Sequence, residues 1–200
     1  GILVARPAKG SSCTLAVSAK GGNNAENHNH NDIGSYAVAL GKCTMVGDQG
    51  GPFSYPGDYF SAEAPEKYKI KGSFGHPVPV VDGKTQSSGA KASAIVLKKE
   101  FTDVKDLLCI DYTSAYSTPS LDKLVRTFVY DRQGKGNFTV GDEFTANAPI
   151  RFETAITTQA NWKIIDDTHL LLTTGTEQMT VTIEAVSYTH LRAHETDSYL

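Results

Sequence analysis

The chain has 200 residues, of which 40% are hydrophobic and 20% are charged, a composition typical of a single soluble domain. A domain of this length can bury a sufficient core without disulfides or a structural metal. The formal net charge of −3 leaves no basic face for nucleic acid, and no run of about 18 apolar residues is present to cross a membrane. Three widely spaced cysteines, Cys13, Cys43 and Cys109, are predicted to be free thiols within apolar segments.

The composition predicts strands separated by turns. The chain has 9 Tyr and 8 Phe, which favour strands, and 18 Gly, which favour turns, but only 2 Met. Apolar or alternating runs predict short strands at 2–6, 14–19, 33–40, 43–46, 78–81, 94–98, 107–112, 124–131, 138–144, 150–157, 162–165, 169–173 and 179–184. Gly41-Lys42 predicts a two-residue hairpin turn. Residues 49–75 have no clean period and predict a long ordered loop, of a kind that is usually functional. These elements predict an all-β fold, an antiparallel two-sheet β-sandwich.

The last residues differ from the rest of the chain. The segment 186–196, VSYTHLRAHET, looks like the in-frame translation of a sequencing-library transposase adapter. We therefore predict one domain over residues 1–185 and a non-native tail over 186–200, and we exclude His190 and His194 as ligands despite their helical spacing. The chain also begins without an initiator Met or a signal segment, so we expect it to be a fragment of a longer protein.

Two histidines stand in the polar run ENHNHND at residues 26–32. In an extended segment alternate side chains share a face, so His28 and His30 are expected to point the same way, about 7 Å apart. That spacing suits one metal ion, or one metal ligand beside a catalytic imidazole. Because the run is almost wholly polar, the pattern favours a functional site over core packing.

Asp48 and His76 could complete such a site. Asp48 follows the apolar strand 43–46, and His76 begins a strand directly after Gly75. Two histidines and an aspartate with an open fourth position are typical of zinc. Taken alone the grouping is weak, because an Asp near glycines is more often a turn residue.

Three segments carry a resemblance to a known family: GGNNAENHNHNDIGSY at 21–36, VGDQG at 46–50 and HPVPVVDG at 76–83. They resemble the heparinase II/III family of polysaccharide lyases, with the run 28–35 as the most specific part and similarity over about residues 2–185. The resemblance implies the C-terminal β-sandwich of an enzyme that also has an N-terminal α/α toroid, which is missing here. It implies that His30, Asp48 and His76 bind one divalent metal, with zinc favoured, and that His28 is the active-site histidine of this domain. Pro77 stands where relatives often have Asn, which removes one hydrogen-bonding side chain.

The reaction implied by the resemblance is β-elimination across the 4-O-glycosidic bond of a uronic acid. A base removes the C5 proton, and polar donors beside the carboxylate stabilise the developing enolate. His28 could serve as donor or acceptor, while the catalytic Tyr belongs to the missing toroid, so we expect this chain alone to be inactive. Tyr59 and Tyr68 of the long loop are our candidates for substrate binding, with Tyr55 as a third. The implied partner is an acidic polysaccharide, and the implied location is periplasmic or secreted.

Two other classes of function stay open from the sequence. A non-catalytic carbohydrate-binding sandwich would present exposed aromatic platforms. A cupin-type metalloenzyme also uses a His-x-His pair but needs a Glu a few residues later, and none occurs before Glu63. Arginines on strands near acidic residues, namely Arg126, Arg132 and Arg151, predict surface or inter-strand ion pairs, and the lone Trp162 is predicted to be core.

Overall fold

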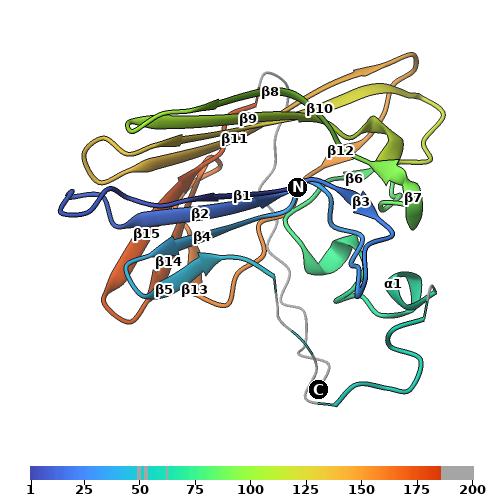
Figure 1. Cartoon of the computed structure of the whole chain (residues 1–200), viewed down its shortest axis with the longest axis horizontal. Coiled ribbons are helices and arrows are strands. Elements are labelled where there is room, and N and C mark those ends of the chain that lie inside the picture. Colours follow the sequence, from blue (N-terminus) through green and yellow to red (C-terminus); the bar gives the residue numbers. More distant parts are fainter. Residues whose placement is uncertain (49–50, 52–53, 62, 186–200) are drawn as a thin grey trace.

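The first sheet contains the N-terminal strands of the fold. In a computed structural model, which describes residues 1–48, 51, 54–61 and 63–185, antiparallel strands dominate (Figure 1). The sheet has the order β1-β2-β4-β5. Its strands are β1 (Ile2–Ala5), β2 (Leu15–Lys20), β4 (Tyr36–Leu40) and β5 (Cys43–Val46). The hairpin predicted at Gly41-Lys42 is confirmed by the antiparallel pairing of β4 with β5.

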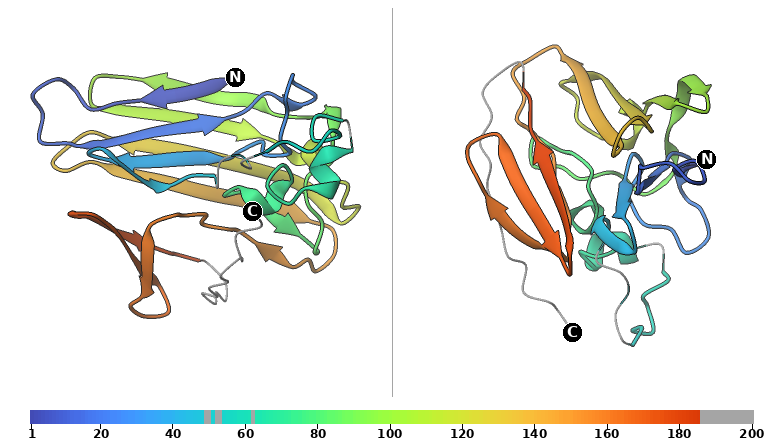
Figure 2. Two further views of the ribbon diagram at one scale, coloured as in Figure 1. Left: turned by 90° about the horizontal axis from the view of Figure 1, so that it is seen from below. Right: turned by 90° about the vertical axis from the view of Figure 1, so that its left-hand side faces the viewer.

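The second sheet is a meander in which sequential strands are neighbours, in the order β11-β10-β9-β8. Its strands are β8 (Ile95–Phe101), β9 (Lys105–Asp111), β10 (Leu121–Asp131) and β11 (Asn137–Ala146). A third sheet follows it in the chain, with the strands β13 (Asn161–Ile164), β14 (His169–Thr174) and β15 (Glu177–Thr182). The views in Figure 2 show the first and second sheets as facing layers, with the third sheet beside them.

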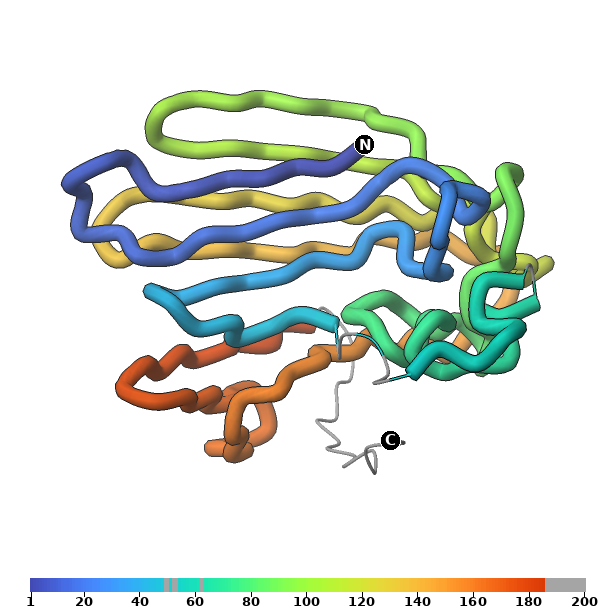
Figure 3. Tube along the Cα trace, turned by 60° about the horizontal axis from the view of Figure 1, so that its bottom comes forward, coloured from blue at the N-terminus to red at the C-terminus, as the bar shows by residue number. Residues whose placement is uncertain are grey.

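Short elements gather at one end of these layers (Figure 1). The paired strands are β3 (Asn23–Asn24) with β7 (Gly89–Ser93), and β6 (Val80–Val81) with β12 (Phe152–Glu153). The helical turns are α1 (Ala64–Lys67) and the 3₁₀ turns η1 (Ser73–Gly75) and η2 (Thr113–Ala115). In Figure 3 the segments around β3 and around α1 and η1 lie together at this end. His28 and His30 follow β3 in the chain, and His76 directly follows η1.

The core is formed where the sheets face one another. Alternation along β2 and β10 places every second side chain inside, as a strand with one buried face requires. One buried cluster, around Ile33, Ile110 and Phe128, lies towards the end with the short elements. A second cluster, around Met45 and Leu172, joins the first sheet to the third.

The all-β antiparallel sandwich predicted from the sequence is confirmed. Where single predicted strands differ from the observed ones, the cause is local. The predicted strand 150–157 is reduced to β12, and β7 was not predicted because GAKAS has neither β-branched nor aromatic residues. Trp162 is 40% exposed, so its assignment to the core is wrong. All three cysteines are free, with Cys13 buried and the other two half-buried. The tail 186–200 lies outside the described residues.

The helical turns named above are short, and the described part of the chain contains no helix that is long and apolar enough to span a bilayer.

Candidate functional site

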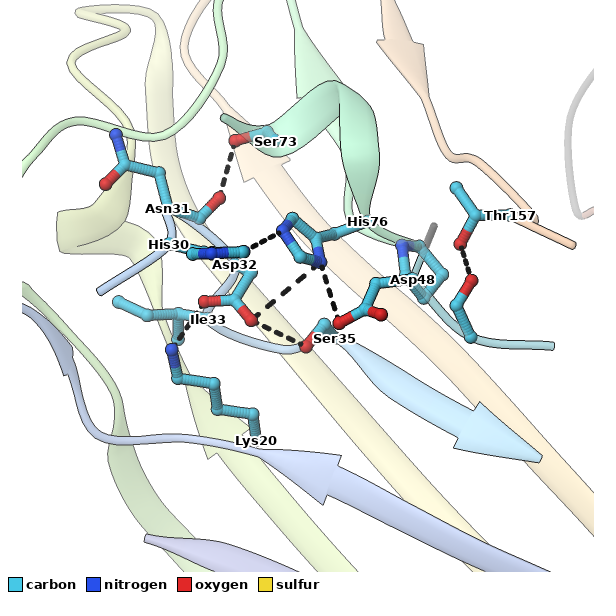
Figure 4. A network of polar contacts seen from close by, with 12 residues as sticks. Lys20, His30, Asn31, Asp32, Ile33, Ser35, Asp48, Ser73, His76 and Thr157 are labelled. Atoms are coloured by element: carbon cyan, nitrogen blue, oxygen red, sulfur yellow. Dashed lines mark hydrogen bonds and ion pairs between the residues drawn. The ribbon is translucent and has the colours of Figure 1, made fainter. Parts of the chain in front are cut away.

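His30 and His76 form the centre of the candidate site. The Nδ1 atom of His30 lies 3.0 Å from Nε2 of His76, within hydrogen-bonding distance (Figure 4). His76 is buried and follows η1, where its backbone N–H donates to the Ser73 carbonyl. When both rings are neutral, one nitrogen of this contact must donate and the other must accept. The two segments predicted to carry metal ligands therefore do meet, through their imidazoles.

Two carboxylates face the other nitrogen of His76. Its Nδ1 lies 3.9 Å from Asp32 and 4.0 Å from Asp48, distances of charge attraction rather than of a hydrogen bond. Asp32 also pairs with Lys20 at 2.5 Å and accepts a hydrogen bond from the Ser35 hydroxyl at 3.2 Å. Sequence reasoning did not single out Asp32, although its place in the polar run at 26–32 was a usable signal.

Burial governs the protonation of the two imidazoles. Desolvation lowers the pKa of His30, and the neighbouring His76 lowers it further. Desolvation also lowers the pKa of His76, against the opposing attraction of Asp32 and Asp48. Burial therefore favours the neutral form of both rings, the form in which an imidazole nitrogen can accept a proton or bind a metal.

Buried polar side chains fix the loop that carries His30. Gln86 accepts from the backbone N–H of Ile33 at 2.9 Å and donates to the carbonyl of the same residue at 2.7 Å. The Ser73 hydroxyl donates to the Asn31 carbonyl at 2.9 Å, which links this loop to η1. Gln86 and Ser73 were missed from the sequence, because neither lies in a recognisable motif.

His28 occupies a different environment from His30. It has a φ of 59° within a turn, so the segment is not extended and the prediction that His28 and His30 share one face is wrong. The His28 ring is exposed and packs against Phe60, with 4.6 Å between ring centroids. His28 is thus accessible to a ligand, while His30 is directed towards His76.

The long loop brings aromatic rings next to His28. Tyr59 is 3% exposed, and the Lys71 ammonium lies 4.9 Å from its ring centroid. Tyr68 is half-buried and donates its hydroxyl hydrogen to Asp58 at 2.6 Å. Tyr55 and Phe60 are exposed, with 5.2 Å between their ring centroids. These two rings offer more surface to a ligand than Tyr59 or Tyr68, whose roles in substrate binding stay predictions.

A cleft of about 460 Å³ opens beside the histidine pair. Lys20, Ser35, Asp48 and His76 are among the residues that line it. The cleft therefore combines the ammonium group of Lys20 with hydroxyl and carboxylate groups, and the ring of His76 is buried at its wall.

The predicted metal site can be tested against this geometry. Two imidazoles and a carboxylate are the donors that zinc prefers. However, His30 contacts one nitrogen of His76 while Asp48 faces the other, so an ion held by all three would require a side chain to move. Among the residues that the structure describes, no group of three His, Cys, Asp or Glu is arranged to hold a metal ion. The donor types fit zinc but their arrangement does not, and the ion stays a prediction.

The fold and the site define an antiparallel β-sandwich with a histidine–carboxylate cluster at one end. No protein-family model and no curated protein sequence matches the chain. Solved structures do match: a heparinase III with methylated lysines aligns with 87% of this chain at a TM-score of 0.66 and 16% identity. A mutant of the heparan sulfate lyase HepC from Pedobacter heparinus aligns with 80% at a TM-score of 0.61 and 19% identity. This chain covers 25% and 24% of those two chains, so the resemblance to heparinases is confirmed for the fold of one part of them.

Proposed function

We propose that this chain is the β-sandwich part of a polysaccharide lyase that cleaves a uronic-acid-containing polysaccharide by β-elimination. The observation that carries the proposal is the shared fold with two solved heparin- and heparan-type lyases, together with a histidine–carboxylate cluster beside a cleft. The chain covers about a quarter of each of those proteins, and the proposal assigns the further catalytic groups to another part of the enzyme.

The chemistry of β-elimination suits the groups at this end of the sandwich. Removal of the C5 proton becomes feasible when donors or cations neutralise the uronate carboxylate, because the developing enolate is then stabilised. His28 is the exposed imidazole and is proposed to contact the substrate as donor or proton acceptor. Lys20 lines the cleft and supplies positive charge, although Asp32 neutralises part of it.

The neutral pair His30–His76 is proposed to hold the loop of His28 in place, or to bind the predicted divalent ion. The donor types suit zinc, but one side chain would have to move before the ion could bind. Export to the periplasm or the medium, where such a polysaccharide would be met, is part of the same proposal.

One observation favours a second candidate function. Tyr55 and Phe60 are more than half exposed and lie next to one another, as in an aromatic platform that stacks on sugar rings. A non-catalytic carbohydrate-binding sandwich would use this platform and would not need His28. The cupin alternative gains no such support, because His28 and His30 do not converge on one point.

Binding measurements separate the two candidates. Heparan sulfate and alginate oligosaccharides, with a neutral oligosaccharide as reference, are titrated into the chain and followed by calorimetry. The lyase proposal predicts preference for the uronates and at least about tenfold weaker binding in His28→Ala, equivalent to about 1.4 kcal/mol. His169→Ala, which removes a half-buried histidine on the third sheet, is the control and should bind normally.

Equal affinity for neutral and anionic oligosaccharides would argue against the lyase proposal. Loss of binding in Phe60→Ala with full binding in His28→Ala would support the binding-module alternative instead.

A further inference from the structure

Arg126, in the middle of β10, is a buried charge that the proposed chemistry does not use. The side chain is 1% exposed, and the residue pairs across strands with Asp142 of β11. Nε and Nη2 donate to the two carboxylate oxygens at 2.7 and 2.6 Å, a bidentate arrangement. The predicted inter-strand ion pair is therefore present, but it lies inside the sandwich rather than at its surface.

The remaining donors of Arg126 reach the loops of the candidate site. Nη1 donates to the carbonyls of Gly34 and Pro77, both at 2.8 Å, and Nη2 donates to Thr154 at 3.3 Å. All five N–H donors of the guanidinium are thus used. Gly34 lies two residues beyond the polar run that carries His30, and Pro77 directly follows His76. One guanidinium therefore joins the two backbone segments whose imidazoles meet.

We propose that Arg126 is a positioning residue that sets the separation and mutual orientation of His30 and His76. This inference rests on the proposed function only in that the histidine pair is taken to belong to the active site. The carbonyls of Gly34 and Pro77 both accept hydrogen bonds from Nη1 of Arg126. The two segments therefore cannot move apart without breaking a buried charge-assisted hydrogen bond.

The surroundings of Arg126 explain why lysine could not take its place. The guanidinium carbon lies 5.9 Å from the ring centroid of Tyr36 and 5.8 Å from that of Tyr112, so the planar group is flanked by two aromatic rings. Tyr112 also donates its hydroxyl hydrogen to Asp142 at 3.0 Å. Lysine has three donors on a single nitrogen and cannot bind the carboxylate in a bidentate manner while reaching both carbonyls.

The test compares Arg126→Lys with Arg132→Lys in the full 200-residue chain. Arg132 lies just beyond the end of β10 and bridges Asp106 and the carbonyls of Arg6 and Thr102, so it is a matched structural arginine away from the histidines. Imidazole nitrogen resonances are recorded by NMR on histidine-labelled protein. We expect those of His30 and His76 to shift and broaden in Arg126→Lys and to keep their wild-type positions in Arg132→Lys.

A purely structural role would lower the stability of both variants without this selective change. Unchanged His30 and His76 resonances in folded Arg126→Lys would overturn the proposal, as would equal shifts in Arg132→Lys. Asp142→Asn provides the second variant should Arg126→Lys fail to fold, because it keeps the side-chain shape and removes the charge partner. It should shift the same two resonances, and wild-type signals there would overturn the proposal. This readout needs no polysaccharide, so failure of the proposed lyase function leaves it unaffected.

Discussion

At the scale of single residues, Gly34 shows how tightly the histidine loop is packed on the second sheet. Its φ of +83° lies in the left-handed region, which side-chain-bearing residues adopt at a cost. A Cβ at this position would lie 3.3 Å from the Tyr112 ring and 3.6 Å from the Arg126 side chain. Gly34 therefore combines a backbone requirement with a close approach to Arg126, whose guanidinium donates a hydrogen bond to the Gly34 carbonyl.

Gly34→Ala is expected to destabilise the protein more than Gly134→Ala. Gly134 has a φ of +58° but no atom within 4 Å of the added Cβ, so it isolates the conformational cost of about 1–2 kcal/mol. Gly34→Ala should exceed the Gly134→Ala value by about 1–3 kcal/mol because of overpacking against Tyr112. Chemical denaturation of both variants measures the difference, and equal losses would show that the contact at Gly34 carries no strain.

The zinc predicted from His30, Asp48 and His76 leads to a separate measurement. If one side chain moves so that all three converge, elemental analysis of the purified chain should find zinc, and His30→Ala should lose it together with part of the thermal stability. His169→Ala should retain the metal content of the parent. Absence of zinc in the parent would show that His30 and His76 act as the hydrogen-bonded pair found in the structure.

At the scale of elements, the turn between β13 and β14 is held by hydrogen bonds to the carboxylate of Asp166. Asp166 accepts hydrogen bonds from the backbone N–H and the hydroxyl of Thr168, at 2.8 and 2.9 Å. Its carboxylate also lies 2.9 Å from the His169 ring. The hydrogen bond from the Thr168 N–H has the largest effect and that from His169 the next largest, and together they lower the pKa of Asp166 to about 2.

This shift predicts a pH dependence of stability with a definite sign. Because the folded pKa of about 2 lies below the value of 3.8 for the free group, the stabilisation is present above about pH 4 and is lost as the pH falls towards 2. Asp166→Asn should therefore unfold at a lower temperature than the parent near neutral pH, and the two curves should converge near pH 2. Asp167→Asn, at the next position, is the control, and a gap that persists unchanged at pH 2 would contradict the prediction.

At the scale of the whole molecule, the chain has the fold of only a part of the lyases that it resembles. It covers 25% of the heparinase III chain and 24% of the HepC chain. A lyase needs a base, a carboxylate neutraliser and a means of holding the polymer, and the sandwich is proposed to contribute only some of these.

The isolated chain is therefore expected to bind a uronate polymer without converting it. Incubation with heparan sulfate or alginate should give no 4,5-unsaturated product above a no-protein blank, as measured by ultraviolet absorbance. The solved heparinase III, assayed alongside on heparan sulfate, is the positive control. Product formed by the isolated chain, and abolished in His28→Ala, would show instead that the sandwich carries a complete active site.

The strand pattern and the candidate residues could be predicted because they depend on local signals. Alternation along 14–19 and 124–131 reflects the two faces of a strand, and the glycine and lysine at 41–42 mark a hairpin irrespective of the remaining chain. The polar run at 26–32 was recognisable because polar residues in such density do not pack into a core. By contrast, an extended conformation was wrongly assigned to His28, since nothing local indicated its positive φ.

The sequence by itself determined the all-β class and most strand positions, and its family resemblance predicted that His30 and His76 lie together, as their contact shows. Only the tertiary structure decided that Asp32 joins Asp48 beside His76, that His28 turns towards Phe60, and that Arg126 and Gln86 hold the loops together. These contacts join residues far apart in the chain, up to 92 positions for Arg126 and Gly34. Local patterns report burial and backbone preference, whereas the partner of a buried donor depends on which segments the packing of the sheets brings within hydrogen-bonding distance.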